Sequence, residues 1–365
     1  MPGALEEAER LYIEGKCKEA KPLFQMAAKE GNPRAMYFMS QYGMFQQGNS
    51  WFYNQEAKDW LLRGIEKGDP FCGITYMLHS EEEREDLSSK APIWKEELEH
   101  NVEDPVSFQV LADFYLSSAH GQDKDAIQKG YDLLRRSAEM GYWKSLEDLG
   151  IFYDDLGKGP NDFAKANMYY EQVASMGIPD GIYRMAFLYY YGKGMKPNKE
   201  KGLYLWKKAA AKGHAGAAMT VGFLYSFSTQ KKLLQEGFRY TKQAADWGIP
   251  TAIGNLANCY YYGKGTRKDK RLAKEWYEKA SDLGLATSTM QLGVIYHEEG
   301  KDKKAFALFQ KSANQGYAEA MGWLAACYHN GYGVEKDESA AHEWLKKAAG
   351  LGSKEAQVAL QNFFA

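Results

Sequence analysis

The feature that most constrains this chain is a glycine that recurs along its whole length at nearly constant spacing. Ten anchor positions form a ladder with intervals of 32 to 38 residues, and nine of the ten are glycine. The anchors are Gly31, Gly68, Glu103, Gly141, Gly177, Gly213, Gly248, Gly284, Gly316 and Gly352. A fixed period of this length indicates a repeat architecture in which each repeat is one small supersecondary structure.

Other residues keep the register of the anchor. The fourth residue after each anchor is always small, and the ninth is small in eight of the ten repeats. The twelfth is tyrosine in seven repeats, namely Tyr115, Tyr153, Tyr189, Tyr225, Tyr260, Tyr296 and Tyr328. Positions 4, 9 and 12 lie near one stripe of a helix with 3.6 residues per turn. We therefore predict a first helix that packs through this stripe, and we assign the tyrosines to the core.

A second amphipathic segment follows about ten residues later and ends at the next anchor. Segments such as "KEKGLYLWKKAAAKG" have lysines and then glycine at their ends, as a helix C-terminus should. We assign Trp206, Trp276 and Trp344 in these segments to the core. One helix pair cannot bury both of its apolar stripes, so neighbouring pairs must stack. The sequence predicts an all-α fold, an α-solenoid of about ten helix-turn-helix repeats of about 36 residues.

The repeats are not equally regular. We expect residues 1–104 to form more degenerate repeats with an acidic insertion near 79–104, and residues 105–352 to form regular repeats. Residues 353–365 are expected to cap the same continuous solenoid with one helix, "SKEAQVALQNFF".

The segments "GHAGAAMTVGFLY" and "GYAEAMGWLAACYHNGYGVEKDESAAHEWLKKAAGLG" resemble the Sel-one-like repeat (SLR) family, whose members are related to tetratricopeptide repeats. The resemblance covers residues 105–356 well and residues 1–104 more loosely. It implies a right-handed α-solenoid whose concave face binds other proteins. It also implies a scaffold or adaptor role rather than catalysis.

The motif "YYYGKG" occurs at 189–194 and again at 260–265, and its Gly-x-Gly beside a lysine resembles a phosphate-binding loop. Such a loop needs a preceding strand and a third glycine, and neither is present here. We interpret the motif as the turn between the two helices of a repeat.

No arrangement of residues in the sequence is typical of a catalytic or metal site, so we expect no enzyme activity, cofactor or metal. Cys259 and Cys327 occupy equivalent places two repeats apart, which is too far for a disulfide. Cys17 and Cys72 share no register with them. We expect four free thiols and no disulfides.

The candidate partner-binding surface follows from the helix register and from the resemblance, which places the first helices on the concave side. If positions 4, 9 and 12 face the core, positions 3, 6, 10, 13 and 14 face the groove. The predicted residues are Asp180, Tyr183, Phe187, Tyr190, Tyr191, Phe223, Phe227, Asn258, Tyr261, Tyr262, His297 and His329. Exposed aromatic clusters suit protein recognition. The alternative is that these aromatic residues belong to the core.

The charge and hydropathy of the chain indicate which classes of partner it can bind. Forty-six basic and 48 acidic residues nearly cancel, so we expect no nucleic acid binding, and no apolar run is long enough for membrane insertion. Residues 79–104 hold ten acidic and three basic residues, and could be a distorted repeat, a surface loop or a site for a basic ligand. Residues 193–279 hold eighteen basic and six acidic residues, and either steer an acidic partner or solvate the outer helices.

The leading functional hypothesis is a non-enzymatic protein–protein interaction scaffold or adaptor that binds its partner through the concave face. One alternative is an immunity protein that neutralises a bacterial toxin or effector by direct binding. A less favoured alternative is an RNA-binding helical repeat protein. Because the N-terminus lacks the pattern of a signal peptide, we expect a cytoplasmic protein, or a periplasmic or secreted one if a leader was removed.

Overall fold

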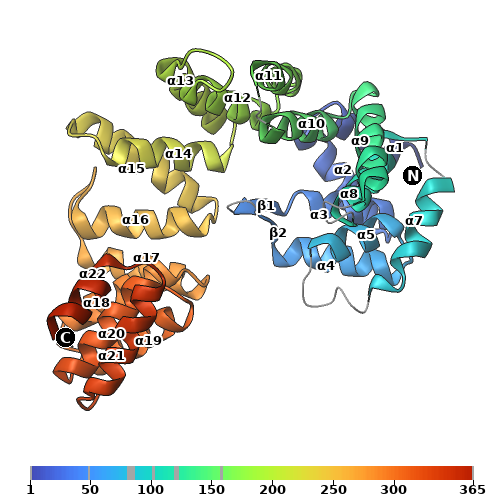
Figure 1. Ribbon diagram of the computed structural model, residues 1–365. Coiled ribbons are helices and arrows are strands. Elements are labelled where there is room, and N and C mark those ends of the chain that lie inside the picture. Colours follow the sequence, from blue (N-terminus) through green and yellow to red (C-terminus); the bar gives the residue numbers. More distant parts are fainter. Residues whose placement is uncertain are drawn as a thin grey trace. The chain divides into compact units, whose positions relative to one another are not determined.

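The computed structural model describes residues 2–47, 50–79, 87–100, 103–118, 123–156 and 159–363. The chain divides into two compact units, residues 1–205 (unit 1) and 206–365 (unit 2) (Figure 1). In both units the described helices follow one another as pairs, so the predicted α-solenoid of helix-turn-helix repeats is confirmed.

Unit 1 contains the first five helix pairs and most of the sixth, whose second helix crosses into unit 2. Its elements are α1 (Pro2–Ile13), α2 (Cys17–Lys29), α3 (Pro33–Gln41), β1 (Met44–Gln47), β2 (Ser50–Tyr53), α4 (Gln55–Glu66), α5 (Pro70–His79), α7 (Ala91–His100), α8 (Pro105–Ser118), α9 (Lys124–Glu139), α10 (Trp143–Leu156), α11 (Pro160–Ser175), α12 (Pro179–Tyr191) and the start of α13 (Lys199–Ala211). The first helices of these pairs are α1, α3, α5, α8, α10 and α12.

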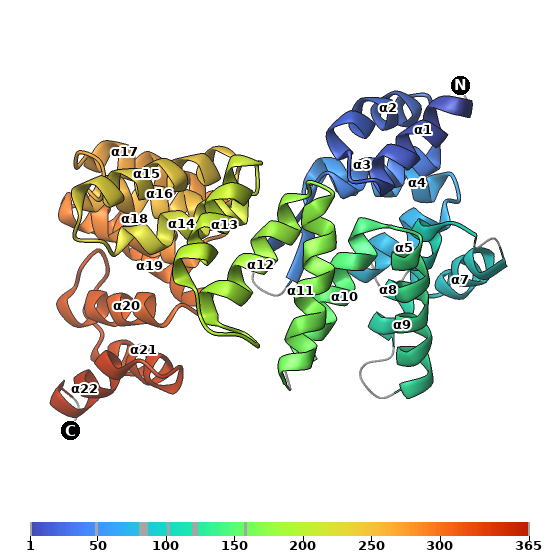
Figure 2. The same ribbon diagram turned by 90° about the horizontal axis from the view of Figure 1, so that it is seen from above.

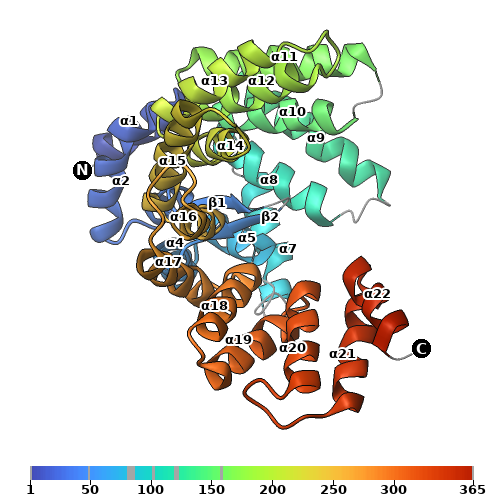
Figure 3. The same cartoon turned by 90° about the vertical axis from the view of Figure 1, so that its left-hand side faces the viewer.

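Unit 2 begins within α13 and continues the series, with successive pairs visible in Figure 3. Its elements are α14 (Ala215–Ser226), α15 (Lys231–Asp246), α16 (Pro250–Tyr262), α17 (Lys270–Asp282), α18 (Ala286–Glu298), α19 (Asp302–Asn314), α20 (Ala318–Asn330), α21 (Glu338–Gly350) and α22 (Lys354–Phe363). The first helices are α14, α16, α18 and α20. The helix α22 is the predicted closing helix.

The anchor glycines end the second helices. All nine of them have a positive φ, between 79° and 99°, which a residue with a side chain adopts only at a cost. At Gly316 the backbone N–H donates to the carbonyl of Ala313 (2.9 Å), and the N–H of Tyr317 donates to the carbonyl of Ser312 (3.3 Å). This hydrogen-bond pattern closes a helix C-terminus. The regularly spaced glycines in the sequence therefore mark the C-terminal ends of the second helices.

The Gly-x-Gly motif is the turn between paired helices, as predicted. Gly263 ends α16 with a φ of 73° and Gly265 has a φ of 71°. A Cβ atom on Gly265 would collide with the carbonyl oxygen of Leu234 in α15. The second glycines of the equivalent turns likewise lie against the second helix of the preceding repeat, Gly194 against Phe163 and Gly333 against Asp302. The motif recurs because each turn packs against the previous repeat.

Small residues on the first helices allow aromatic rings of the second helices to approach closely. A Cβ on Gly150 would lie 2.5 Å from the ring of Tyr170, and one on Gly293 would lie 2.7 Å from the ring of Phe309. Both rings are fully buried. Because interiors are close-packed, position 9 must stay small where a ring fills the space beside it.

The tyrosines at position 12 are less uniform than expected. Tyr115 and Tyr225 are buried, and the other five are half-buried. Lysine ammonium groups lie over three of the half-buried rings. Measured to the ring centre, Lys165 lies 4.7 Å from Tyr153, Lys201 lies 3.7 Å from Tyr189, and Lys274 lies 3.8 Å from Tyr296. These rings therefore pack on one face and receive a cation on the other.

The three tryptophans assigned to the core also differ in burial. Trp206 is fully buried, whereas Trp276 and Trp344 are half-buried. Lys279 and Lys347 each lie 4.2 Å from the ring of the tryptophan three residues before them.

One feature of the N-terminal repeats was not expected from the sequence. The strands β1 and β2 form an antiparallel hairpin, with Met44 opposite Tyr53, between α3 and α4. The acidic segment 79–104 contains α7, while residues 80–86 and 101–102 of that segment lie outside the described residues.

Unit 1 closes on itself, because its first repeat packs against its fifth. The ring of Tyr12 lies 6.4 Å from that of Tyr142 and 6.0 Å from that of Trp143. Lys144 Nζ donates a hydrogen bond to Gln41 Oε1 (2.9 Å). Figure 2 shows α1 to α4 gathered in one bundle. The first helices α1, α3 and α10 thus cover one another, and much of the first-helix face of unit 1 is occupied by the protein itself.

Candidate binding surface

The structure places all twelve predicted partner-binding residues on first helices or at their ends. Asp180, Tyr183, Phe187, Tyr190 and Tyr191 belong to α12 of unit 1, and the other seven belong to α14, α16, α18 and α20 of unit 2. Four of the twelve are large exposed apolar or aromatic side chains: Tyr191, Phe223, Phe227 and Tyr262. The rest are half-buried or buried.

The residues on α12 form one aromatic cluster. Tyr183 and Phe187 meet edge to face with centroids 4.9 Å apart, and Tyr191 contacts Phe187 at 6.1 Å and Tyr190 at 5.1 Å. Tyr191 is 60% exposed and the other three rings are half-buried. The cluster is thus an aromatic patch whose accessible part is mainly Tyr191.

In unit 2 the exposed aromatic residues lie near the C-terminal ends of α14 and α16. Phe223 and Phe227 are 55% and 69% exposed and meet edge to face at 4.9 Å. Lys264, in the turn after α16, places its ammonium group 5.8 Å from the ring of Phe227. This contact joins the two neighbouring repeats into one surface.

Tyr261 and Tyr262 are adjacent in sequence but differ in exposure. Tyr262 is 54% exposed, whereas Tyr261 is only 9% exposed and donates a hydrogen bond from its hydroxyl to Glu298 Oε1 (2.6 Å). The expectation that the ring of Tyr261 is exposed is therefore wrong. The reason is that α18 of the next repeat covers it.

Asn258 contributes to a small polar cavity between α16 and α18. Its Oδ1 accepts a hydrogen bond from the hydroxyl of Tyr277 (2.5 Å). The cavity is about 230 Å³ and is also lined by Asn255 and Gln291. Amide groups at this place can pair with the backbone of an extended peptide.

The two predicted histidines are tied to the second helices of their own repeats. His297 Nδ1 lies 2.6 Å from Asp302 Oδ1, and its ring contacts that of Tyr332 at 4.8 Å. His329 Nδ1 lies 2.9 Å from Glu338 Oε2. Both imidazoles therefore link the end of a first helix to the start of the second.

A cluster of carboxylates in unit 1 was missed by the sequence reasoning. A cavity of about 270 Å³ is lined by residues of α3, α5, α8, α10 and α12, among them Asp113, Glu147, Asp148 and Asp180. The ammonium group of Lys144 and the ring of His79 are in the same lining. One predicted residue, Asp180, thus belongs to a site whose other carboxylates were not predicted.

Hydrogen bonds hold two of these carboxylates together. Gln109 Nε2 donates to Asp113 Oδ1 (2.9 Å) and to Asp148 Oδ2 (2.6 Å). Gln109 Oε1 in turn accepts from the hydroxyl of Ser145, which orients the amide. A single amide group therefore bridges the two carboxylates.

Burial shifts the pKa of these carboxyl groups upward. Burial and the neighbouring Asp148 raise the pKa of Asp113 to about 7. Burial, followed by the charge of Asp180, raises the pKa of Glu147 to about 8, and this side chain is only 5% exposed. Arg184 Nε lies 3.4 Å from Glu147 Oε1 and, with Lys144, offsets only part of the lost hydration, so these carboxyl groups hold protons more tightly than exposed ones do.

A signal for this cavity was present in the register. Positions 3 and 6 after Gly141 are Lys144 and Glu147, and position 10 after Glu103 is Asp113. These are the positions expected to face the groove. The same rule applied to the earlier repeats finds six of the lining residues, namely Gln41, Leu78, Asp113, Ser117, Lys144 and Glu147.

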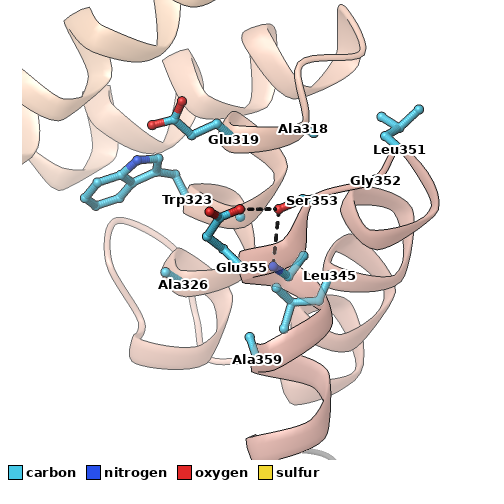
Figure 4. A pocket seen from close by; sticks show the side chains of 12 residues that line it. Ala318, Glu319, Trp323, Ala326, Leu345, Leu351, Gly352, Ser353, Glu355 and Ala359 are labelled. Atoms are coloured by element: carbon cyan, nitrogen blue, oxygen red, sulfur yellow. Dashed lines mark hydrogen bonds between the residues drawn. The ribbon is translucent and has the colours of Figure 1, made fainter.

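A larger cavity of about 800 Å³ lies between α20 and α22 (Figure 4). Small residues, Leu345 and the indole of Trp323 form most of its lining, with the carboxylates of Glu319 and Glu355 beside them. Ser353 Oγ lies 3.2 Å from Glu355 Oε2 and accepts from the N–H of Ala356 (3.2 Å). The cavity is large enough for several side chains of a bound peptide.

Basic residues are absent from the first helices of unit 2. The sequences of α14, α16, α18 and α20 contain no lysine or arginine. The basic residues of the 193–279 stretch therefore lie on second helices and in turns.

The structure also bears on the predictions about disulfides, metal ions and membrane insertion. All four cysteines, Cys17, Cys72, Cys259 and Cys327, are free thiols. Among the described residues, no group of three or more His, Cys, Asp or Glu side chains is placed to hold a metal ion. No helix in the described part of the chain has the length and apolar character needed to cross a bilayer.

The repeat pattern matches a known family. The family model for the Sel1 repeat matches residues 110–142, 143–178, 179–214, 250–285, 287–317 and 318–353, which together make up more than half of the chain. The repeat formed by α14 and α15 lies between the matched segments.

Curated relatives include two yeast proteins. Chitin synthase regulatory factor 3 of Schizosaccharomyces pombe is 24% identical over 277 residues, covering 70% of this chain and 29% of that protein. Chitin synthase regulator SKT5 of Saccharomyces cerevisiae is 26% identical over 257 residues, covering 65% of this chain and 37% of that protein. The chain thus spans less than half the length of either relative.

Among solved structures, c5321 has a similar fold. This protective antigen of uropathogenic Escherichia coli strains displays an SLR fold and superposes with a TM-score of 0.56. It is 23% identical, and the match covers 94% of this chain and 82% of that one. At this identity the likeness supports the fold alone.

Proposed function

Because the chain belongs to the Sel1 repeat family, whose repeats are protein-interaction scaffolds, we propose that it is a non-enzymatic adaptor that binds a partner protein through the first-helix face of unit 2. The observation that carries this proposal is the exposure of Phe223, Phe227 and Tyr262 at the ends of two neighbouring first helices. Exposed aromatic groups of this size are expensive to keep in water and typically mark interaction sites.

Two further observations support unit 2 over unit 1. The first helices of unit 1 cover one another through Tyr12, Tyr142 and Trp143. Unit 2 holds a polar cavity between α16 and α18, and a cavity lined by small and apolar residues between α20 and the closing helix α22. The cavity on the first helices of unit 1 is instead lined by carboxylates. An extended segment lying across α14 to α22 would meet an aromatic surface, amide groups and an apolar cavity in turn.

The names of the two yeast relatives describe regulators of an enzyme, and regulation through protein contact fits this proposal. Neutralisation of a toxin or effector would use the same face, and it is the second candidate function. Binding of RNA is the least favoured, since α14, α16, α18 and α20 lack lysine and arginine.

The test is affinity capture from the source cell's lysate with three baits. These are the wild type, the triple variant Phe223→Ala/Phe227→Ala/Tyr262→Ala, and the control Trp247→Ala, which removes an exposed aromatic side chain at the end of α15. We expect proteins retained by the wild type and the control to be lost from the triple variant. All three must show the same circular dichroism and melting temperature. Equal capture by the triple variant would contradict the proposal.

The captured protein also separates the two candidate roles. If it is toxic when expressed alone and its toxicity disappears in the presence of this chain, the role is neutralisation. If the partner keeps its activity, or changes it only in degree, the role is that of an adaptor.

A further inference from the structure

We propose that the partner meets unit 2 with an acidic segment that carries an aromatic or aliphatic side chain, and that this segment docks on the α14–α16 patch. The patch consists of Phe223, Phe227, Tyr262, Lys231, Lys232, Lys264, Arg267 and Lys268. This inference rests on the proposed function and names the chemistry of the partner.

The apolar part of the patch is the pair of phenylalanines with Tyr262. The three side chains are each more than half exposed, and the two phenylalanine rings stand nearly perpendicular, at 79°. One ring thus presents its edge to the face of the other, and both rings remain more than half exposed. A single buried aromatic or aliphatic side chain of a partner would cover it.

The charged part consists of five exposed cations that form no ion pair with a described residue. They are Lys231, Lys232, Lys264, Arg267 and Lys268. The next two basic residues along the chain differ, since Lys270 is paired with Glu298 (2.9 Å) and Arg271 with Glu275 (2.5 Å). Lys268 acts on the nearby carboxylate of Glu298, and its ammonium group lies 5.6 Å from the centre of the Tyr261 ring. The positive charge without a close carboxylate is therefore that of Lys231, Lys232, Lys264 and Arg267.

The two parts are contiguous. The turn that carries Lys264 lies against α15, because a Cβ on Gly265 would collide with the carbonyl of Leu234. Lys264 also reaches the ring of Phe227, which is four residues before Lys231. Lys264 thus borders the phenylalanine pair, and Lys231 and Lys232 begin α15 shortly after Phe227 in the chain.

The start of α15 adds to the positive potential. Its N-cap residue, Gln230, makes no side-chain cap, and its first turn holds two lysines and no acidic residue. The first turns of α17 and α21 are instead capped by the carboxylates of Asp269 and Asp337. Lysines at a helix N-terminus oppose the helix dipole, so this end of α15 is unfavourable until an anionic group approaches it. A partner's Asp or Glu side chains would supply that group.

The geometry favours a protein segment over single-stranded RNA, which is also bound by aromatic and basic side chains. Bases need open ring faces for stacking. Here the two phenylalanine rings cover each other edge to face, and Lys264 lies over the ring of Phe227. The cations also form a local cluster and do not continue along α16, α18 or α20.

The experiment measures fluorescence anisotropy of labelled probes with the full chain at low salt. The main probe is a twelve-residue peptide in which Asp and Glu flank one Phe and one Leu. A second peptide has Ser in place of Phe and Leu, a third has Asn and Gln in place of the acids, and the fourth probe is a twelve-nucleotide oligouridine. We expect the first peptide to bind at least tenfold more tightly than the other three probes.

Charge reversal provides the decisive variants. Lys264→Glu/Lys268→Glu should weaken the first peptide at least tenfold, and Phe227→Ala at least fivefold. The control Lys208→Glu/Lys212→Glu makes the same change in charge at the C-terminal end of α13, at residues outside the patch, and should bind as the wild type does. Absence of binding by the first peptide, an unchanged affinity in Lys264→Glu/Lys268→Glu, or tighter binding of oligouridine would each overturn the proposal.

The same variants separate this inference from the proposed function. If the captured cellular partner is lost from the aromatic triple variant but retained by Lys264→Glu/Lys268→Glu, the first-helix face binds a protein whose contact is not acidic. The proposed function then stands and the inference fails. If both variants retain the captured partner, the result would contradict the proposed function and this inference alike.

Discussion

The hydroxyl of Tyr261 donates a hydrogen bond to Oε1 of Glu298 over 2.6 Å, and this bond links α16 to α18 of the next repeat. Lys270 Nζ lies 2.9 Å from the other carboxylate oxygen of Glu298. Tyr262, the next residue in the chain, points to solvent. Tyr261 thus forms a contact between repeats, whereas Tyr262 belongs to the accessible surface.

Because of this difference, replacing each tyrosine with phenylalanine should change the stability at one position and not at the other. Tyr261→Phe removes a hydrogen bond to a carboxylate and should lower the free energy of unfolding by about 1–2 kcal/mol. Tyr262→Phe, the matched control, should leave it unchanged within about 0.5 kcal/mol because the hydroxyl is in water. Urea denaturation followed by circular dichroism measures both. Equal stability of the two variants would show that Tyr261 does not bind Glu298.

The carboxylates of unit 1 predict that its stability falls as pH rises. Asp113 and Glu147 have folded-state pKa values of about 7 and about 8, whereas unfolded carboxyl groups titrate near pH 4. Between these limits the folded chain binds protons that the unfolded chain has released, so the free energy of unfolding decreases with pH. The melting temperature of unit 1 should therefore be higher at pH 5.5 than at pH 8.5.

Replacing one of these carboxyl groups tests the origin of that dependence. Asp113→Asn should raise the free energy of unfolding at pH 8.5 by on the order of 1–3 kcal/mol, and should flatten the dependence on pH. The control is Asp59→Asn in α4, since Asp59 is exposed and accepts a hydrogen bond from Gln55 (2.9 Å) as Asp113 does from Gln109. Calorimetry across pH is the measurement. A control that behaves like Asp113→Asn would rule out the buried cluster as the cause.

Substitutions at two glycines distinguish the cost of backbone strain from the cost of a steric collision. Gly284 has a φ of 85° and no heavy atom within 4 Å of a would-be Cβ, so Gly284→Ala should cost only about 1 kcal/mol of strain. Gly265→Ala adds a collision with the carbonyl of Leu234 and should cost at least twice as much. Denaturation midpoints compare them. Equal costs would mean that the turn does not pack against α15.

The cysteines predict slow reaction with thiol reagents in the folded state. Burial raises the pKa of Cys17 and Cys259 to about 11 and that of Cys327 to about 12, and it also raises the pKa of Cys72. The reactive thiolate is therefore scarce at pH 8. We expect iodoacetamide to label all four thiols in denaturant and to leave them nearly unlabelled without it, as read by intact mass. Rapid labelling of Cys72, Cys259 or Cys327 in the folded chain would contradict the burial of that thiol.

The repeat, the helix pairs and the closing helix could be read from the sequence because their causes are local. A glycine such as Gly316 is required wherever a helix ends with a positive φ, and small residues such as Gly293 are required wherever a ring packs against the helix. These requirements recur once per repeat, so they appear as a period. The helix register also placed the candidate residues on first helices. Their role in binding a partner stays a prediction.

Features that depend on residues far apart in the chain could not be read in this way. Tyr261 and Tyr262 share a helix end, yet their exposure depends on Glu298 in the next repeat. The contact of Tyr12 with Tyr142 and Trp143, which closes the first-helix face of unit 1, joins the first repeat to the fifth. The carboxylate cavity draws its lining from five helices. Burial, pKa and accessibility are properties of these assembled surfaces, and a helical period describes only which side of one helix a residue occupies.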